Sequence, residues 1–381
     1  MRDAKAVIVV EDDVFSRLIQ VVCDPRTSPE RLADFSEFMA HDEPDFAGWC
    51  RRLRREIAEI VPSDVRFVTS QDELREALPD ATAAVVESLT IGKPELDVAP
   101  LLRVVQKFGV VTRNIDVEAC AERGVQVRTQ RRRSNTSCAE YVIMMMLALS
   151  RKLLGTAGRI SPELLAQAGY TAKTFAGIHT ARNNWGRIPG LKVLYESTLG
   201  LIGFGEIGRE IATRAAAFGM DIVYSQRTRA SVEDERAYGV RYESLEGLLA
   251  QSDFVSIQLP AGAATHNFLD RERLALVKPG AFLINVARAE LIERDALLEA
   301  LDAGRLGGFA LDPLYEAPGR SEDPLLQYDN VVLTPHIAAQ PRFNALNDMV
   351  ELLTGLRAGI VAGSASAQDR DRAVAERDDG R

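Results

Sequence analysis

A glycine-rich turn joins a short apolar run directly to an amphipathic helix pattern near the middle of the chain. The run TLGLIG (198–203) is typical of a buried strand, and GFGEIG (203–208) follows it without an intervening loop. The apolar residues of the following segment recur on one helical face, at Ile207, Ile211, Ala215 and Phe218. A strand that passes through such a turn straight into a helix predicts a β–α unit of a parallel sheet.

Each glycine of this turn meets a different steric requirement. Gly203 permits the tight turn, Gly205 allows the backbone to approach a pyrophosphate, and Gly208 allows the helix and the strand to pack closely. Glu206 and Ile207 begin the helix, whose first N–H groups are available to an anion. A glycine-rich turn without a ligand is the alternative, but the flanking strand and helix favour a dinucleotide site.

Apolar runs alternate with helix patterns along all 381 residues, and at about 150 residues per domain this length predicts two or three domains. Hydrophobic residues make up 46% and charged residues 27%, which is the composition of an ordinary globular protein. The predicted fold class is α/β, with two doubly wound parallel-sheet domains. The expected strands are 6–10, 65–69, 83–87, 102–108 and 125–129 in the first domain, and 198–203, 221–225, 253–259, 281–286, 308–311 and 331–334 in the second.

Other segments lie between or after these strands. Residues 16–63 are expected to form a polar, helical insertion, and 137–153 a long apolar helix. The connector 155–192 contains Gly and Pro and has little periodicity. A last helix is expected over 343–358, and residues 364–381 mix both charge signs without large apolar side chains, which predicts a disordered tail.

Composition argues against several kinds of partner. The net charge of −9 disfavours sequence-independent DNA binding, which requires Lys and Arg to neutralise phosphates. The longest apolar run, 141–149, is shorter than the roughly 20 residues of a membrane span, and the N-terminus is unlike a signal peptide. The chain has no CxxC pair, so a metal site is not expected. Four scattered cysteines predict a reduced, cytoplasmic protein: Cys23, Cys50, Cys120 and Cys138.

Polar or turn-forming residues follow five of the expected strands in the second half of the chain. In a parallel sheet the carboxyl ends of the strands share one edge, and ligands bind beyond that edge. Polar residues at strand ends are common in any case, so the signal lies in the series as a whole: Gln226, Pro260, Arg288, Asp312 and His336.

Three of the residues near these strand ends have the chemistry that reduction of a 2-keto acid requires. His336 follows Thr334-Pro335 and is the best-placed general acid or base, although a lone histidine is more often structural. Arg288 carries a planar guanidinium that matches a carboxylate in two hydrogen bonds. Glu316, in the loop before the His336 strand, is the candidate carboxylate partner of the imidazolium.

From about Leu101 to Asn347 the chain resembles the D-isomer-specific 2-hydroxyacid dehydrogenases. The motifs that carry the resemblance occur in family order and include VVQKFGVVTRNIDVEACAERGVQV (104–127), TLGLIGFGEIGREIA (198–212), LVKPGAFLINVARAELIERDALLEAL (276–301) and NVVLTPHIAA (330–339). The resemblance implies a flavodoxin-like substrate domain and a Rossmann cofactor domain with a cleft between them. The substrate domain would be residues 1–135 and 338–363, with the cofactor domain, 136–337, inserted.

The resemblance also implies roles for individual residues. Arg288 matches the arginine that binds the carboxylate and carbonyl of the keto acid, and His336 matches the catalytic acid/base. Asp312 matches the carboxylate at the nicotinamide end of the cofactor, with Pro260 and Ala287 among the other cofactor contacts. The backbone near Val110 and Val111 matches the loop that holds the substrate carboxylate. Family members commonly form homodimers through the cofactor domain, which nominates the apolar helix over 137–153 as the contact.

The chain departs from the family pattern in several places. Aligned on Pro318, the usual glutamate position holds Ala317, and the carboxylate is displaced to Glu316. The glycine after Arg288 is Ala289. Cations occupy unusual positions near the expected substrate loop and hinge: Arg113, Arg131, Arg132 and Arg133. They either favour a substrate with a second acidic group or pair with local carboxylates.

The strand over 221–225 bears on the choice between NAD and NADP. Sites for NAD usually place Asp or Glu after this strand to bind the ribose 2′-hydroxyl. Here the position holds Gln226, 18 residues after Gly208, and Arg227, Thr228 and Arg229 follow. Without a repelling carboxylate, these groups favour the 2′-phosphate of NADP(H). The alternative, in which both arginines point to solvent, leaves a site for NAD or for both cofactors.

These observations predict an oxidoreductase that moves a hydride between NAD(P)H and a small 2-keto or 2-hydroxy acid. The competing hypothesis is a non-catalytic protein that senses the dinucleotide on the same fold. Arg288 and His336 favour catalysis, and the displaced Glu316 weakly disfavours it. A related enzyme acting on another small anion, such as formate, has no positive feature in the sequence.

Overall fold

The computed structural model describes the backbone of residues 5–378 and the side chains of residues 5–363. It divides into two compact units, which are described one at a time. Unit 1 comprises residues 1–134 and 340–381, and unit 2 comprises 135–339. The boundaries expected from the sequence, 135/136 and 337/338, lie within two residues of this division.

Unit 1 contains a five-stranded sheet in which every pair of neighbouring strands is parallel. The strand order 2-1-3-4-5 is that of flavodoxin-like folds and has its switch point between the first and third strands. In this order, the strands are β2 (Ser63–Val68), β1 (Ala6–Glu11), β3 (Ala83–Val86), β4 (Val104–Lys107) and β5 (Gln126–Arg128).

Helices cover both faces of the unit 1 sheet, because its strands bury alternate residues on opposite sides. Ile8 and Val10 of β1 face one core, and Val9 faces the other. The first face is covered by α1 (Leu18–Cys23), α2 (Pro29–Met39), α3 (Phe46–Glu56), η1 (Ala58–Ile60) and α15 (Phe343–Asp378). The second is covered by α4 (Gln71–Ala77), α5 (Lys93–Asp97) and α6 (Val117–Glu122).

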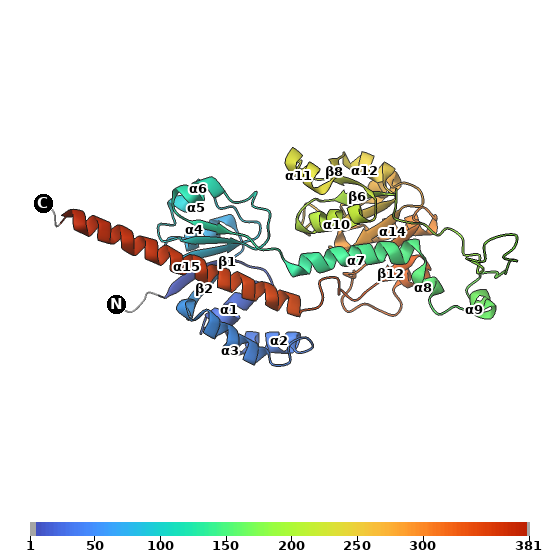
Figure 1. Ribbon diagram of the computed structural model, residues 1–381. Helices are drawn as coiled ribbons and strands as arrows, with labels where there is room; N and C mark the ends of the chain where they lie inside the picture. The colour runs from blue at the N-terminus through green and yellow to red at the C-terminus, as the bar shows by residue number, and fades with distance from the viewer. Residues whose placement is uncertain (1–4, 379–381) are drawn as a thin grey trace. The chain divides into compact units, whose positions relative to one another are not determined.

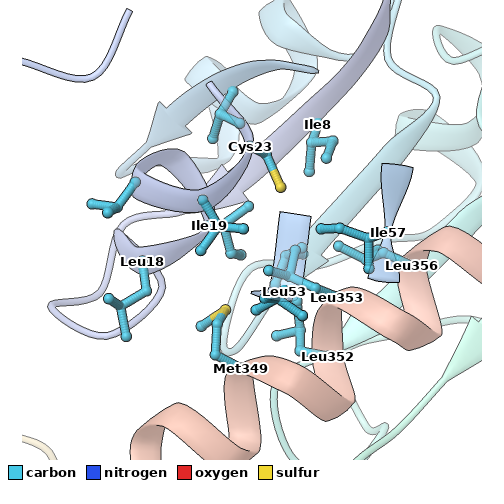
Figure 2. Packing of buried hydrophobic residues seen from close by; sticks show 14 of the residues in the cluster. Ile8, Leu18, Ile19, Cys23, Leu53, Ile57, Met349, Leu352, Leu353 and Leu356 are labelled. Carbon is cyan, nitrogen blue, oxygen red and sulfur yellow. The ribbon is translucent and has the colours of Figure 1, made fainter. Parts of the chain in front are cut away.

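The C-terminal helix α15 completes the core of unit 1. Figure 2 shows Leu352, Leu353 and Leu356 of this helix against Leu53 and Ile57, and none of these five side chains is more than 2% exposed. This packing explains how the two ends of the chain form one unit (Figure 1).

The helix α15 is longer than the sequence predicts, because it continues from Phe343 to Asp378 and not to about 358. The expected disordered tail, 364–381, is therefore helical as far as its last described residue, 378. Ala, Arg, Glu and Gln are good helix formers, and neither Pro nor Gly interrupts residues 364–378. Residues 364–378 lack the large apolar side chains that a packed core requires, but a helix does not require them.

Unit 2 contains a seven-stranded sheet, again parallel throughout. The order reverses between β6 and β9, which is the topological switch point. The strands, from one edge to the other, are β12 (Val331–Leu333), β11 (Gly308–Leu311), β10 (Phe282–Asn285), β9 (Phe254–Ile257), β6 (Thr198–Ile202), β7 (Asp221–Ser225) and β8 (Val240–Tyr242).

Two layers of helices enclose this second sheet as well. One face packs against α7 (Arg133–Ser150) and α10 (Glu206–Ala217), and the other against α12 (Leu245–Gln251), α13 (Arg271–Leu276) and α14 (Arg294–Asp302). The remaining elements of unit 2 are the short helices α8 (Leu153–Thr156), α9 (Pro162–Gln167), α11 (Val232–Tyr238), η2 (Ala289–Leu291) and η3 (Pro324–Gln327). The two sheets confirm the predicted fold class, and the short edge strand β8 is an addition to it.

Candidate active site

The glycine loop after β6 has the geometry expected of a phosphate-binding turn. Gly203 has φ +100°, and a Cβ there would lie 2.6 Å from the Gln258 carbonyl oxygen. A Cβ on Gly208 would lie 2.7 Å from the Gly203 carbonyl oxygen, so both positions require glycine. Around Gly205, in contrast, a Cβ would meet no described atom within 4 Å. The backbone is thus open at the N-terminus of α10, where the pyrophosphate of a dinucleotide fits.

The parallel sheet places the predicted polar residues along the same edge as this loop. Gln226 follows β7, Arg288 follows β10, and Asp312 and His336 follow β11 and β12. Pro260 lies beyond β9, where its carbonyl oxygen accepts a hydrogen bond of 2.7 Å from Thr265 Oγ1. The strands β10, β11 and β12 are neighbours in the sheet, so Arg288 and His336 lie on either side of Asp312 in strand order.

The Arg288 loop is held by a buried asparagine. Asn285, which has no exposed surface, accepts from the Ala287 N–H (3.0 Å) and donates from Nδ2 to the Arg288 carbonyl (2.8 Å). The Arg288 side chain is exposed, and its Nη1 donates to the Ala287 carbonyl at 2.7 Å. Asn285 therefore shapes the backbone while most of the guanidinium donors stay available to a ligand.

The His336 turn is organised by the carboxylate of Asp312. Asp312 is 1% exposed, and its Oδ1 accepts from Thr334 Oγ1 (2.7 Å) and from the Ile337 N–H (2.8 Å), while Oδ2 accepts from the Ala338 N–H (2.8 Å). These bonds close around His336, whose φ of +56° is in the left-handed region that disfavours residues other than glycine. Asp312 thus acts on the turn that presents the exposed imidazole.

A tyrosine of α7 extends this polar network. Tyr141 hydrogen-bonds with Thr334, and burial raises the pKa of its phenol. The side chain therefore remains a neutral hydroxyl at the pH of an ordinary assay.

The structure does not bring Glu316, the expected partner of His336, together with that histidine. The Glu316 carboxylate instead lies 2.6 Å from Nε of Arg320 and 4.0 Å from Nη1 of Arg294. Within residues 5–363, no hydrogen bond or ion pair joins it to His336. The physical reason is local, since two arginines compete for the displaced carboxylate, while the position aligned with the usual glutamate holds Ala317.

The loop after β7 contains two exposed arginines, of which Arg229 forms an ion pair and Arg227 does not. Gln226 Oε1 accepts from the Phe204 N–H (3.3 Å), and its Nε2 donates to the Thr228 carbonyl (2.7 Å), which ties this loop to the glycine loop. Arg229 donates two hydrogen bonds to Glu235, at 2.7 and 2.8 Å. Arg227 is exposed, and no hydrogen bond or ion pair to its side chain occurs among the described residues.

The expected substrate loop belongs to unit 1, where it follows β4. Val110 is 41% exposed and Val111 is half-buried. The nearby cation of Arg132 lies 4.0 Å from the ring centroid of Phe108 and donates to Glu87 at 2.7 Å.

Two other unusual cations, Arg133 and Arg113, are both exposed. Arg133 pairs with Asp348 at 2.8 Å and with Glu351 at 3.0 Å. Arg132 and Arg133 therefore pair with local carboxylates, which was one of the two interpretations left open.

Sequence reasoning missed three residues that shape this site: Asn285, Thr334 and Glu235. A buried Asn at a strand end, two residues before a turn, is a usable signal, because one amide can both donate and accept. Thr334 acts through Asp312, 22 residues earlier, and Glu235 through Arg229, six residues earlier in the preceding loop, so neither pair follows a helix or strand period. Among residues 5–363, no cluster of three or more His, Cys, Asp or Glu residues is arranged to hold a metal ion. The described helices include none that is both long and apolar enough to span a membrane.

Asp312→Asn should lower the free energy of unfolding of unit 2. The amide offers only one accepting oxygen, so it leaves a buried N–H of the turn unpaired, at a cost of about 1–3 kcal/mol. Urea denaturation measures the loss, and Asp329→Asn, at an exposed carboxylate, is the control. Equal stability of Asp312→Asn and the wild type would show that these hydrogen bonds do not hold the turn.

Comparison with known proteins gives this edge of unit 2 a family context. Residues 167–338 match the family model described as "D-isomer specific 2-hydroxyacid dehydrogenase, NAD binding domain". The glyoxylate reductase of Thermococcus onnurineus is 33% identical over 303 residues, which are 79% of this chain and 86% of the relative. The glyoxylate reductase of Pyrococcus furiosus is 35% identical over 284 residues, which are 74% of this chain and 80% of the relative.

A solved structure agrees with this assignment at the level of the fold. The apo D-mandelate dehydrogenase of Rhodotorula graminis has a TM-score of 0.55 and 23% identity, over 92% of this chain and 93% of that one. With the matched motifs, the curated relatives and the fold in agreement, the chain belongs to the D-isomer-specific 2-hydroxyacid dehydrogenases, nicotinamide-dependent oxidoreductases of 2-keto and 2-hydroxy acids.

Proposed function

We propose that the protein reduces small 2-keto acids, giving the D-2-hydroxy acid wherever C2 becomes a stereocentre, with glyoxylate as the first substrate to test and NADPH as the preferred hydride donor. The observation that supports this most is that Arg288, His336 and the open glycine loop all lie at the carboxyl ends of the parallel strands of unit 2. The names of the two relatives, both glyoxylate reductases, support the choice of substrate.

Arg288 is the residue proposed to bind and polarise the substrate. Its guanidinium is planar and permanently charged, so two of its N–H groups can hold a carboxylate while another approaches the C2 carbonyl oxygen. The hydrogen bond from Nη1 to the Ala287 carbonyl orients the fork without neutralising it. The backbone near Val110 and Val111, which is the expected carboxylate loop of unit 1, is part of the same proposal.

His336 is proposed to donate the proton in reduction. When bound, the reduced nicotinamide supplies a hydride to C2, and the carbonyl oxygen then carries the developing negative charge. The imidazolium gives its proton to that oxygen, becomes neutral and regains a proton from solvent. The turn fixed by Asp312 and Thr334 determines where the imidazole points.

Arg288→Lys and His336→Ala should each abolish most turnover while dinucleotide binding persists. Lysine keeps the charge but loses the planar fork, which should raise the barrier by about 2 kcal/mol or more, or roughly 30-fold in kcat/KM. Steady-state kinetics on a panel of 2-keto acids measures this, with the exposed Arg236→Lys and His266→Ala as matched controls. Near-normal kcat/KM in either site variant would remove that residue from the mechanism. Tight dinucleotide binding without turnover on any keto acid would instead favour the sensor hypothesis.

The preference for NADPH is proposed to depend on Arg227. Arg227 is exposed and follows Gln226. Gln226 occupies the position where a carboxylate would repel a 2′-phosphate. Arg227→Ala should therefore reduce kcat/KM for NADPH about tenfold, because one screened charge-assisted hydrogen bond is lost. The kcat/KM for NADH should change little. Arg236→Ala, at an exposed arginine of α11, is the control. Equal use of both cofactors by the wild type, with no selective loss in Arg227→Ala, would overturn the assignment.

A homodimer formed through unit 2 is also proposed. The helix α7 offers little apolar surface for such a contact, because most of its large apolar side chains are buried and Met144 is the most exposed at 46%. The connector offers more, since Ile160 is 82% and Ile178 87% exposed. Light scattering at micromolar concentration should give the mass of two chains, and Ile160→Asp with Ile178→Asp should lower it. A monomer mass for the wild type would rule the dimer out.

A further inference from the structure

An ion pair closes the loop that follows β7. Arg229 donates from Nε to Glu235 Oε1 (2.7 Å) and from Nη2 to Oε2 (2.8 Å), so the fork of its guanidinium is filled by one carboxylate. Tyr224 Oη donates to the same Oε1 at 2.7 Å. The Arg229 side chain is 58% exposed and that of Glu235 only 11%, which places the carboxylate beneath the arginine.

The Glu235 carboxylate stays charged over the whole range of enzyme assays. The hydrogen bonds from Arg229 and Tyr224 lower its pKa to about 2. A lowered pKa means that the ion pair is lost only as the pH falls toward that value, so protonation does not open it near neutrality. Burial and the hydrogen bond to Glu235 raise the pKa of Tyr224 to about 12, which keeps its hydroxyl a donor.

The position of this ion pair is important because of what binds there in dinucleotide folds. The residues just after the second strand of the unit contact the adenosine ribose, and an arginine there accommodates a 2′-phosphate. Arg227 and Arg229 are the two arginines of this loop. A bidentate arginine binds a phosphate or a carboxylate through the same pair of donors, so Glu235 occupies the donors that a 2′-phosphate would use.

We propose that Glu235 determines cofactor specificity by masking Arg229, so that the 2′-phosphate of NADP(H) is recognised by Arg227 alone. This inference rests on the proposed use of a nicotinamide dinucleotide by this site. Glu235 acts through Arg229 and is a positioning residue, not a catalytic one. Releasing Arg229 should increase the affinity for NADP and leave the affinity for NAD almost unchanged.

The rest of α11 does not depend on Glu235 for its place in unit 2. Asp234, the preceding residue, accepts two hydrogen bonds of 2.8 Å from Arg209 of α10. Arg209 is 6% exposed and lies 5.0 Å from the ring centroid of Phe204 and 5.1 Å from that of Tyr238. The Ala230 N–H also keeps its hydrogen bond to Tyr224 Oη at 3.0 Å. Glu235→Gln should therefore leave the loop and helix in place while removing the charge.

The test compares the dissociation constants of NADP⁺ and NAD⁺, measured by calorimetry on the full-length protein at low salt. Glu235→Gln should tighten NADP⁺ binding about tenfold, the gain of one screened charge-assisted hydrogen bond, and change NAD⁺ binding less than about twofold. Glu233→Gln removes an equal charge from an exposed position on the same helix and should change neither constant. Adding Arg229→Ala to Glu235→Gln should abolish the gain.

Three results would overturn the masking role. They are unchanged or weaker NADP⁺ binding in Glu235→Gln, an equal gain in Glu233→Gln, or a gain that survives Arg229→Ala. If Glu235→Gln does not fold, Arg229→Ala alone decides: it should cost little NADP⁺ affinity, whereas a loss as large as that of Arg227→Ala would contradict the masking. If the wild type binds neither dinucleotide, the proposed function fails; if it binds them and the ratio does not respond, only this inference fails.

Discussion

The parallel order of the unit 2 sheet is the constraint on which the site depends. Because all seven strands run in one direction, the glycine loop, Gln226, Arg288, Asp312 and His336 are at the same edge although they span more than 130 residues of sequence. Reversing a single strand would move its terminal residue to the opposite edge. The two layers of helices bury both faces of the sheet, so this edge is where polar side chains can meet a ligand.

Carboxylates near this edge act mainly on the protein itself. Asp312 holds the His336 turn, Glu235 holds Arg229, and Glu316 pairs with Arg320 and Arg294. The exposed groups that remain for ligands are largely cationic or imidazole, such as Arg227, Arg288 and His336. That balance suits an anionic substrate and a phosphate-bearing cofactor, and it occurs on a chain whose net charge is −9.

Much of this arrangement could be predicted from local sequence. The strand, turn and helix around Gly203 were predictable because burial on both sheet faces leaves short apolar runs, and because the tight turn requires glycine. The residues at the strand ends followed from those runs. The pair of Glu316 with Arg320 spans only four residues, whereas the longer 4.0 Å approach of Arg294, 22 residues earlier, depends on the fold and was not predictable from local sequence. The strand β8 was missed because three residues at a sheet edge carry almost no periodic signal.

The most direct test of this account follows a label from the cofactor to the substrate. The wild-type protein is incubated with reduced nicotinamide cofactor that carries deuterium at the transferring position and with a 2-keto acid such as pyruvate, and the product is analysed by NMR and chiral chromatography. We expect the D-2-hydroxy acid with deuterium at C2. Dinucleotide binding without deuterium at C2 of any 2-hydroxy acid product would contradict the central claim.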